Sequence, residues 1–163
     1  MGRIGMAVSA LGIFILAHGT GALAHQTASK FQALSKDLTT EATSALSAAD
    51  AERAQGLYER ALVADPANVQ ALIGLGRAHE AQGRVGRSLK YYRHALELEP
   101  NELTALEAQA LAFLKRDLVD RAKRNRDKLA RLCLTGCTAL TSVDEALSQY
   151  EATETAEAET QGR

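Results

Sequence analysis

The sequence contains no tryptophan, only two prolines and few aromatic residues (4%), and these absences restrict the fold. Apolar residues make up 46% of the chain, but most of them are alanine and leucine, which favour thin, closely packed helices over a bulky globular core. After residue 24, no stretch alternates apolar and polar residues with the period of two that a half-buried strand requires. The composition therefore predicts an all-α protein.

The chain also lacks an excess of charge of either sign. Its 19 basic and 20 acidic residues nearly cancel, which leaves a formal net charge of −1. A chain of this kind has no general electrostatic attraction for the phosphates of nucleic acid. We therefore expect no nucleic-acid partner.

The first 24 residues have the pattern of a signal peptide. A positive start at Arg3 is followed by residues 4–17, an apolar stretch broken only by glycine and serine, and Ala22, Leu23 and Ala24 supply a small-x-small cleavage pattern. The alternative is an uncleaved membrane anchor, although the apolar run is shorter than the roughly 20 residues that a spanning helix needs. The pattern predicts an exported protein, periplasmic where the source has a periplasm and otherwise secreted.

Apolar residues recur at steps of three and four through most of the remaining chain, the spacing that places them on one face of a helix. Residues 151–163 are instead mainly glutamate, threonine and alanine, with no large apolar side chain, so we expect a disordered acidic tail there. Asn68 is placed to cap a helix after the break at Pro66. The helices expected are an entering helix at residues 25–50, then residues 52–63, 69–82, 85–98, 103–115 and 119–132, and a short capping helix over residues 142–150 that starts from the capping-box spacing of Ser142 and Glu145.

One series of residues occurs twice at an interval of 34. It consists of a small residue, a tyrosine, an alanine and a proline: Ala54, Tyr58, Ala61 and Pro66, and then Ser88, Tyr92, Ala95 and Pro100. The small residues allow two antiparallel helices to approach closely, and the proline ends the unit so that the chain can reverse. The interval predicts a helical repeat protein.

This series resembles the signature of the tetratricopeptide repeat family. The match is best over residues 69–102, at Leu72, Leu75, Gly76, Gly83, Ser88, Tyr92, Ala95 and Pro100. The resemblance implies antiparallel helix-turn-helix repeats over residues 51–132, with the second repeat at residues 69–102 and the third at residues 103–132. It implies a short right-handed α-solenoid, closed by a turn and capping helix over residues 133–150, with residues 25–50 as an entering helix or the degenerate first helix of the first repeat.

The resemblance also implies a function in binding. Members of the family bind peptides or proteins along a concave surface lined by the first helix of each repeat, so it implies an adaptor or assembly factor that recognises a protein segment. The alternative occupant of that surface is a second copy of the chain, which would make a homo-oligomer. The positions carried over to this chain are Thr39, Thr43, Gln70, Ile73, Arg77, Glu80, Glu107, Leu111 and Leu114.

Two features of the sequence bear on what this concave surface could bind and on which residues are exposed in it. The members that clamp a C-terminal carboxylate use lysine, asparagine and arginine, whereas this chain has Ile73, Ala108 and Glu107 at the corresponding places, so we expect no clamp of that type. Leu111 and Leu114 have two interpretations of equal weight, as groove residues or as packing beneath the capping helix.

Cys133 and Cys137 are the only cysteines. In an oxidising compartment such a pair tends to form a disulfide, and the helix must then end between the two residues, which Gly136 permits. The alternative is a redox or metal-handling accessory protein that uses this pair, although the spacing is not that of thiol oxidoreductases. The disulfide is our first interpretation.

Residues 115–131 hold eight basic and three acidic residues. This excess fits weak contact with an anionic membrane surface or an acidic protein, and it equally fits the solvated outer face of a helix.

No set of residues in the sequence predicts catalysis. His79 and His94 fall on different expected helices, and no serine or cysteine has a base at the spacing of a known motif. We therefore expect a protein that is not an enzyme and has neither a cofactor nor a metal site.

Overall fold

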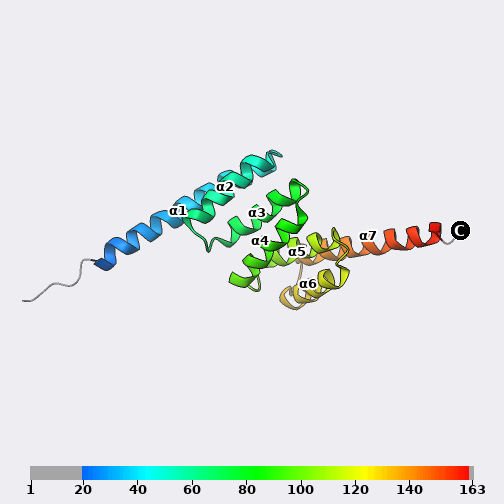
Figure 1. The fold of residues 1–163 in the computed structure, drawn as a ribbon. Coiled ribbons are helices and arrows are strands. Elements are labelled where there is room, and N and C mark those ends of the chain that lie inside the picture. Colours follow the sequence, from blue (N-terminus) through cyan, green and yellow to red (C-terminus); the bar gives the residue numbers. More distant parts are fainter. Residues whose placement is uncertain (1–19, 162–163) are drawn as a thin grey trace, which may run out of the picture.

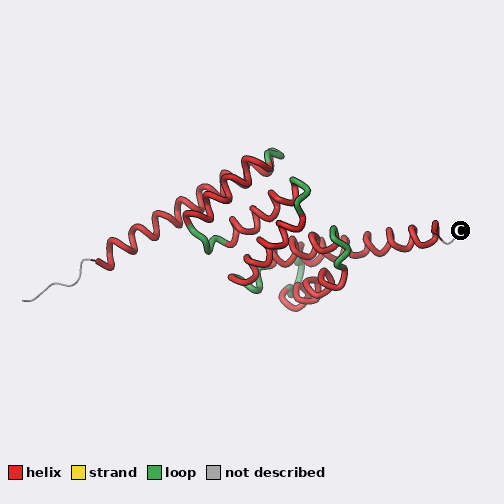
Figure 2. Tube along the Cα trace, in the orientation of Figure 1, coloured by secondary structure: helices red, strands yellow, loops and turns green. Residues whose placement is uncertain are grey.

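The structure, a computed structural model, describes residues 20–161, with side chains described from residue 27 to residue 157 and at residue 160. This part of the chain is all helical, with no strand (Figures 1 and 2). Its elements are α1 (Thr20–Ser47), α2 (Ala51–Ala64), α3 (Val69–Ala81), α4 (Val85–Leu98), α5 (Leu103–Leu114), α6 (Val119–Leu132) and α7 (Thr138–Gln161). The predicted all-α fold class is confirmed.

The helices pack as successive antiparallel pairs. Each of α1, α3 and α5 packs against the helix that follows it, and each pair packs against the next. The first helices of the pairs also touch one another, α1 against α3 and α3 against α5. α7 packs on α5 and α6, where the first helix of a fourth pair would lie (Figure 1). This arrangement is a short helical solenoid with a final capping helix.

The turn residues explain where the central helices begin and end. Asp65 ends α2 with an extended backbone (φ −142°), as expected for the residue before a proline. Asn68 caps α3, because its side chain accepts a hydrogen bond from the Ala71 backbone N–H, which confirms the predicted cap. Gly83 has φ +72° in the turn between α3 and α4, a conformation that glycine adopts without steric cost.

Two tyrosines fill the spaces between these helices, and two glycines of α3 make room for them. A Cβ on Gly74 would lie 2.2 Å from the ring of Tyr58, and a Cβ on Gly76 would lie 2.3 Å from the ring of Tyr92. Both tyrosines are buried, Tyr58 at 2% exposure and Tyr92 at 0%. The repeated tyrosine is therefore a core residue that depends on small partners in α3.

The two ends of the chain differ from the sequence predictions. α1 begins at Thr20, inside the segment predicted as a signal peptide, and residues 1–19 of that segment lie outside the described residues. None of the described helices combines the length and the hydropathy needed to cross a membrane.

At the other end, α7 begins at Thr138 rather than at residue 142, because the Cys137 carbonyl accepts from the backbone N–H groups of Leu140 and Thr141. The tail that we expected to be disordered from residue 151 is helical as far as Gln161. Its alanine and glutamate residues are good helix formers, and extending an existing helix needs no new nucleus and no buried face. Hydropathy alone therefore missed this part of the helix.

Candidate functional site

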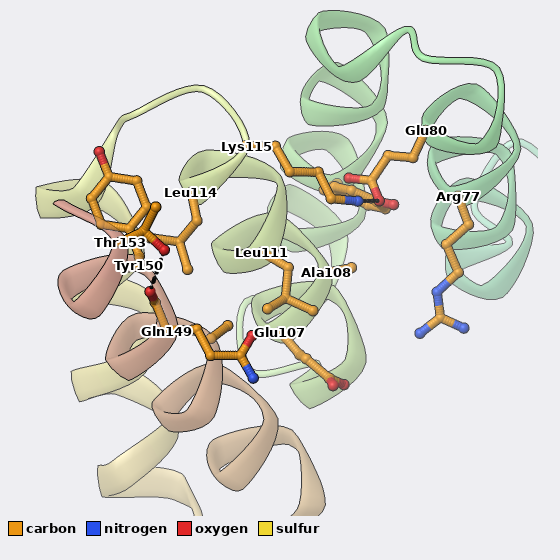
Figure 3. A pocket seen from close by; sticks show the side chains of 12 residues that line it. Arg77, Glu80, Glu107, Ala108, Leu111, Leu114, Lys115, Gln149, Tyr150 and Thr153 are labelled. Carbon is orange, nitrogen blue, oxygen red and sulfur yellow. Dashed lines mark hydrogen bonds and ion pairs between the residues drawn. The ribbon is translucent and has the colours of Figure 1, made fainter. Parts of the chain in front are cut away.

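A cleft of about 450 Å³ lies between α3, α5 and α7 (Figure 3). It is lined by apolar residues of α5 and α7, by charged residues of α3 and α5 and by polar residues of α7. Its lining is Arg77, Glu80, Tyr92, Glu107, Ala108, Leu111, Leu114, Lys115, Ala146, Gln149, Tyr150 and Thr153.

The apolar part of the cleft comes mainly from α5. Leu111 and Leu114 lie on the side of α5 that faces α7, where they pack with Val143 and Leu147. Ala108 stands 34 residues after Gly74, and its short side chain packs near Tyr92 without filling the space beside it. The helix therefore presents branched side chains toward α7 and a small one toward α3, which leaves a hollow.

Charged side chains surround this apolar surface. The Lys115 Nζ lies 3.2 Å from Glu80 Oε2, an ion pair that joins the end of α5 to α3. Arg77 and Glu107 have no hydrogen-bond or ion-pair partner among the described residues. In Figure 3, Arg77 stands apart from the other side chains drawn. The cleft therefore offers one cation and one anion that are not paired within the chain.

The Tyr92 hydroxyl is the one buried oxygen in this lining that has no hydrogen-bond partner among the described residues. Burial, reinforced by the carboxylate of Glu80, raises the pKa of Tyr92 well above its ordinary value, so the phenol stays protonated. The hydroxyl hydrogen therefore has no acceptor within the described chain. The equivalent tyrosine of the preceding pair is satisfied, since the hydroxyls of Tyr58 and Thr43 are hydrogen-bonded at 3.0 Å.

The cleft gathers five of the nine residues predicted for the concave surface: Arg77, Glu80, Glu107, Leu111 and Leu114. For Leu111 and Leu114 both interpretations hold together, because each lines the cleft and packs in the core beneath α7.

The other predicted residues lie elsewhere. Thr39 and Gln70 line a second hollow of about 490 Å³ between α1 and α3, and the Thr43 hydroxyl is hydrogen-bonded to that of Tyr58. Ile73 is a correction: it is only 2% exposed and belongs to the core. It is buried because α5 packs on α3 with small residues such as Ala105 and Ala112, which bring the two helices close together.

Sequence reasoning missed the contribution of α7. Gln149, Tyr150 and Thr153 line the cleft, yet the sequence predicted only a short capping helix with no assigned face. Lys115, at the end of α5, was also missed. Ala108, which the sequence places at a clamp position of the concave surface, also lines the cleft.

The two cysteines lie at the junction between α6 and α7. They are joined as a disulfide with a Cα–Cα distance of 5.6 Å, and Gly136 between them has φ +61°. Both are half-buried against the core beneath α7, while Leu134 in the same turn is 93% exposed. Among the described residues, no three histidine, cysteine, aspartate or glutamate side chains come close enough to hold a metal ion.

His79 lies outside the cleft and is 2% exposed. Its ring stacks on Tyr91 with 5.2 Å between centroids, and its Nδ1 has no hydrogen-bond partner in the described part of the chain. Burial lowers the pKa of His79 below the ordinary value of 6.5, and Arg84 and Arg87 act in the same direction against a smaller opposing effect of Glu59. The ring is therefore a neutral core group at pH 7.

The basic residues of α6 lie on its outer side, and two of them bind α7. Lys123 Nζ lies 2.9 Å from a carboxylate oxygen of Glu151, and Arg126 Nε lies 2.6 Å from Asp144 Oδ1. Part of the basic excess thus holds the capping helix in place.

Comparison with known proteins agrees with this geometry. Residues 39–102 match the family model described as "Tetratricopeptide repeat". No curated protein matches the chain.

Solved structures share the fold at low sequence identity. The first TPR domain of human RPAP3 superposes with a TM-score of 0.64 at 16% identity, covering 73% of this chain and 96% of that one. The Sgt2 TPR domain from Aspergillus fumigatus gives a TM-score of 0.66 at 22% identity, with 79% and 83% covered. The Yersinia enterocolitica type III secretion chaperone SycD, in complex with a peptide of the translocator YopD, gives 0.65 at 16%, with 73% and 93% covered.

Proposed function

This chain is a tetratricopeptide repeat protein, and on that premise we propose that it is a non-enzymatic adaptor or assembly factor that binds a segment of a partner protein in the cleft between α3, α5 and α7. The observation that carries the proposal is the composition of this cleft. It combines an apolar surface at Leu111 with the unpaired charges of Arg77 and Glu107.

An apolar surface beside unpaired charges suits a peptide better than a small apolar molecule. Ligand sites are mostly apolar with a few polar groups that fix the orientation of the ligand, and their volumes start at about 300 Å³. At about 450 Å³ the cleft has room for one or two large side chains, not for a folded domain. In support, the structural neighbour SycD has been solved in complex with a peptide.

Site-specific photo-crosslinking tests the proposal. A photo-reactive amino acid replaces Arg77 in the cleft, and the matched control replaces Arg93, an exposed residue of α4 whose side chain is 69% accessible. We expect a discrete crosslinked partner from position 77 that is absent from position 93 and that disappears when Leu111→Asp is added. Equal crosslinking from both positions, or crosslinking that survives Leu111→Asp, would contradict binding in the cleft.

We also propose that the protein is exported and acts in the periplasm, or outside the cell where the source has none. The support is the sequence of residues 1–24, with its positive start, apolar stretch and small-x-small end. Mass spectrometry of the protein purified from its source should give a mature chain that begins at His25. A chain that retains Arg3 and sediments with membranes would support the uncleaved anchor instead.

The disulfide supports a second candidate, a redox accessory function for Cys133 and Cys137. Thiol titration of protein taken from its native compartment separates the two functions. A disulfide that serves structure alone stays fully oxidised, whereas reversible cycling under mild reduction would favour the redox function.

A further inference from the structure

The Tyr92 hydroxyl marks a point in the cleft where the chain leaves a hydrogen-bond donor unused. Tyr92 is 0% exposed, it lines the cleft, and its oxygen has no partner among the described residues. A buried polar group without a partner is costly, so such groups are rare in folded proteins.

The internal repeat contains an equivalent tyrosine whose hydroxyl does have a hydrogen-bond partner. Tyr58 stands 34 residues before Tyr92, and its hydroxyl bonds to Thr43 of α1 at 3.0 Å. The residue 34 positions after Thr43 is Arg77. An arginine side chain has five N–H donors and no acceptor, so it cannot take the hydrogen of the Tyr92 hydroxyl.

Glu80 also lines the cleft and carries two acceptor oxygens, but these bind other residues. One carboxylate oxygen of Glu80 lies 3.2 Å from Lys115 Nζ, and the other accepts from the Ser88 hydroxyl at 3.3 Å. No hydrogen bond joins Glu80 to the Tyr92 hydroxyl, which is left without an acceptor among the described residues.

The charges of the cleft indicate which acceptor would fit. Two carboxylates, Glu80 and Glu107, line it together with Arg77 and Lys115. These four charges cancel, so the lining gives no net attraction that would offset the cost of removing a ligand carboxylate from water, whereas the carbonyl oxygen of a peptide bond is neutral and accepts as well. A main-chain carbonyl is therefore the better match.

We infer that the cleft binds a partner segment in which a main-chain carbonyl accepts a hydrogen bond from the Tyr92 hydroxyl while a neighbouring large apolar side chain packs on Leu111 and Ala108. This inference rests on the proposed function and specifies its chemistry. Arg77 and Lys115 line the same cleft as Tyr92 and have long, exposed side chains, so rotation of these side chains gives a bound segment access to the hydroxyl.

The first experiment needs no ligand and compares Tyr92→Phe with Tyr58→Phe by urea unfolding. Tyr58→Phe breaks the bond to Thr43, so its unfolding midpoint should fall. Tyr92→Phe removes a hydroxyl that has no partner, so its midpoint should stay the same or rise. An equal fall for both variants would show that Tyr92 has an internal acceptor, and would overturn the inference.

The second experiment measures binding by NMR titration of the leucine methyl groups. The probes are acetylated and amidated nonapeptides of alanine and serine with leucine, methionine or phenylalanine at the centre. The matched set replaces the carbonyl of the central residue by a methylene group. We expect the methyl signals of Leu111 and Leu114 to shift with the first set, and we expect about two- to tenfold weaker binding for the methylene peptides and for Tyr92→Phe.

The outcomes separate this inference from the proposed function. Tyr58→Phe should bind as the wild type does. Binding at Leu111 that is equally strong for Tyr92→Phe and for the methylene peptides would overturn the inference and leave the cleft as a binding site. No shift at Leu111 with any peptide would overturn both.

Discussion

Replacing Gly74 by alanine tests the packing that holds the repeats together. The added Cβ would lie 2.2 Å from the Tyr58 ring, a distance that requires the ring or the helix to move. The ring is buried and its hydroxyl is bonded to Thr43, so it cannot move without losing contacts. Overpacking of this kind costs about 1–3 kcal/mol.

Gly56 provides a matched control in an adjacent helix. It lies in α2, it is exposed, and a Cβ at this position would meet nothing within 4 Å. Alanine in place of glycine inside a helix stabilises by about 0.5–1 kcal/mol, and this gain applies to both sites. We therefore expect Gly56→Ala to raise the free energy of unfolding by about 0.5–1 kcal/mol and Gly74→Ala to lower it by about 0.5–2 kcal/mol.

The assay is urea unfolding followed by circular dichroism at about 222 nm, with the m-values of both variants compared with that of the wild type. The difference between the two variants isolates the cost of the clash, because the gain in helix propensity is common to both. A Gly74→Ala protein as stable as Gly56→Ala would refute the close approach of Tyr58 to α3.

Three further predictions concern other parts of the structure. Asn68→Ala should destabilise by about 1–3 kcal/mol in urea unfolding, because Asn68 caps α3 and donates to two hydroxyls of α1, whereas the exposed control Asn101→Ala should change little. The lowered pKa of His79 means that the unfolded state binds more protons below pH 6.5, so stability should fall on acidification from that point by up to about 1.4 kcal/mol per pH unit, a slope that His79→Leu removes. Truncation after Tyr150 should lower the unfolding free energy by less than about 1 kcal/mol, since residues 151–157 are exposed and the ion pair lost there is a surface pair; a larger loss would show that the tail packs on the solenoid.

The central helices could be predicted closely because local residues determine their ends. α4 was predicted at its observed bounds, and α2 and α3 within one residue. Pro66, Asn68 and Gly83 each act on the backbone next to them, and such effects are visible in the sequence.

The cleft could be predicted only in part, because it depends on how helices far apart in the sequence meet. The repeat register placed Arg77 and Glu107 on one surface, and both line the cleft. It failed for Ile73, whose burial depends on the close approach of α5 to α3. It also gave no sign that Gln149 of α7 would line the cleft, since the face that a capping helix presents is set by packing and not by its own sequence pattern.

Hydrogen exchange of the complex with its crosslinked partner tests the central claim most directly. Binding in the cleft predicts slower exchange of backbone amides in α3, in α5 and in the first half of α7, with little change in α2, α4 and α6. The matched control is the Leu111→Asp protein mixed with the same partner, in which this protection should be lost. Protection confined to α2, α4 and α6, the second helices of the pairs, would contradict binding in the cleft.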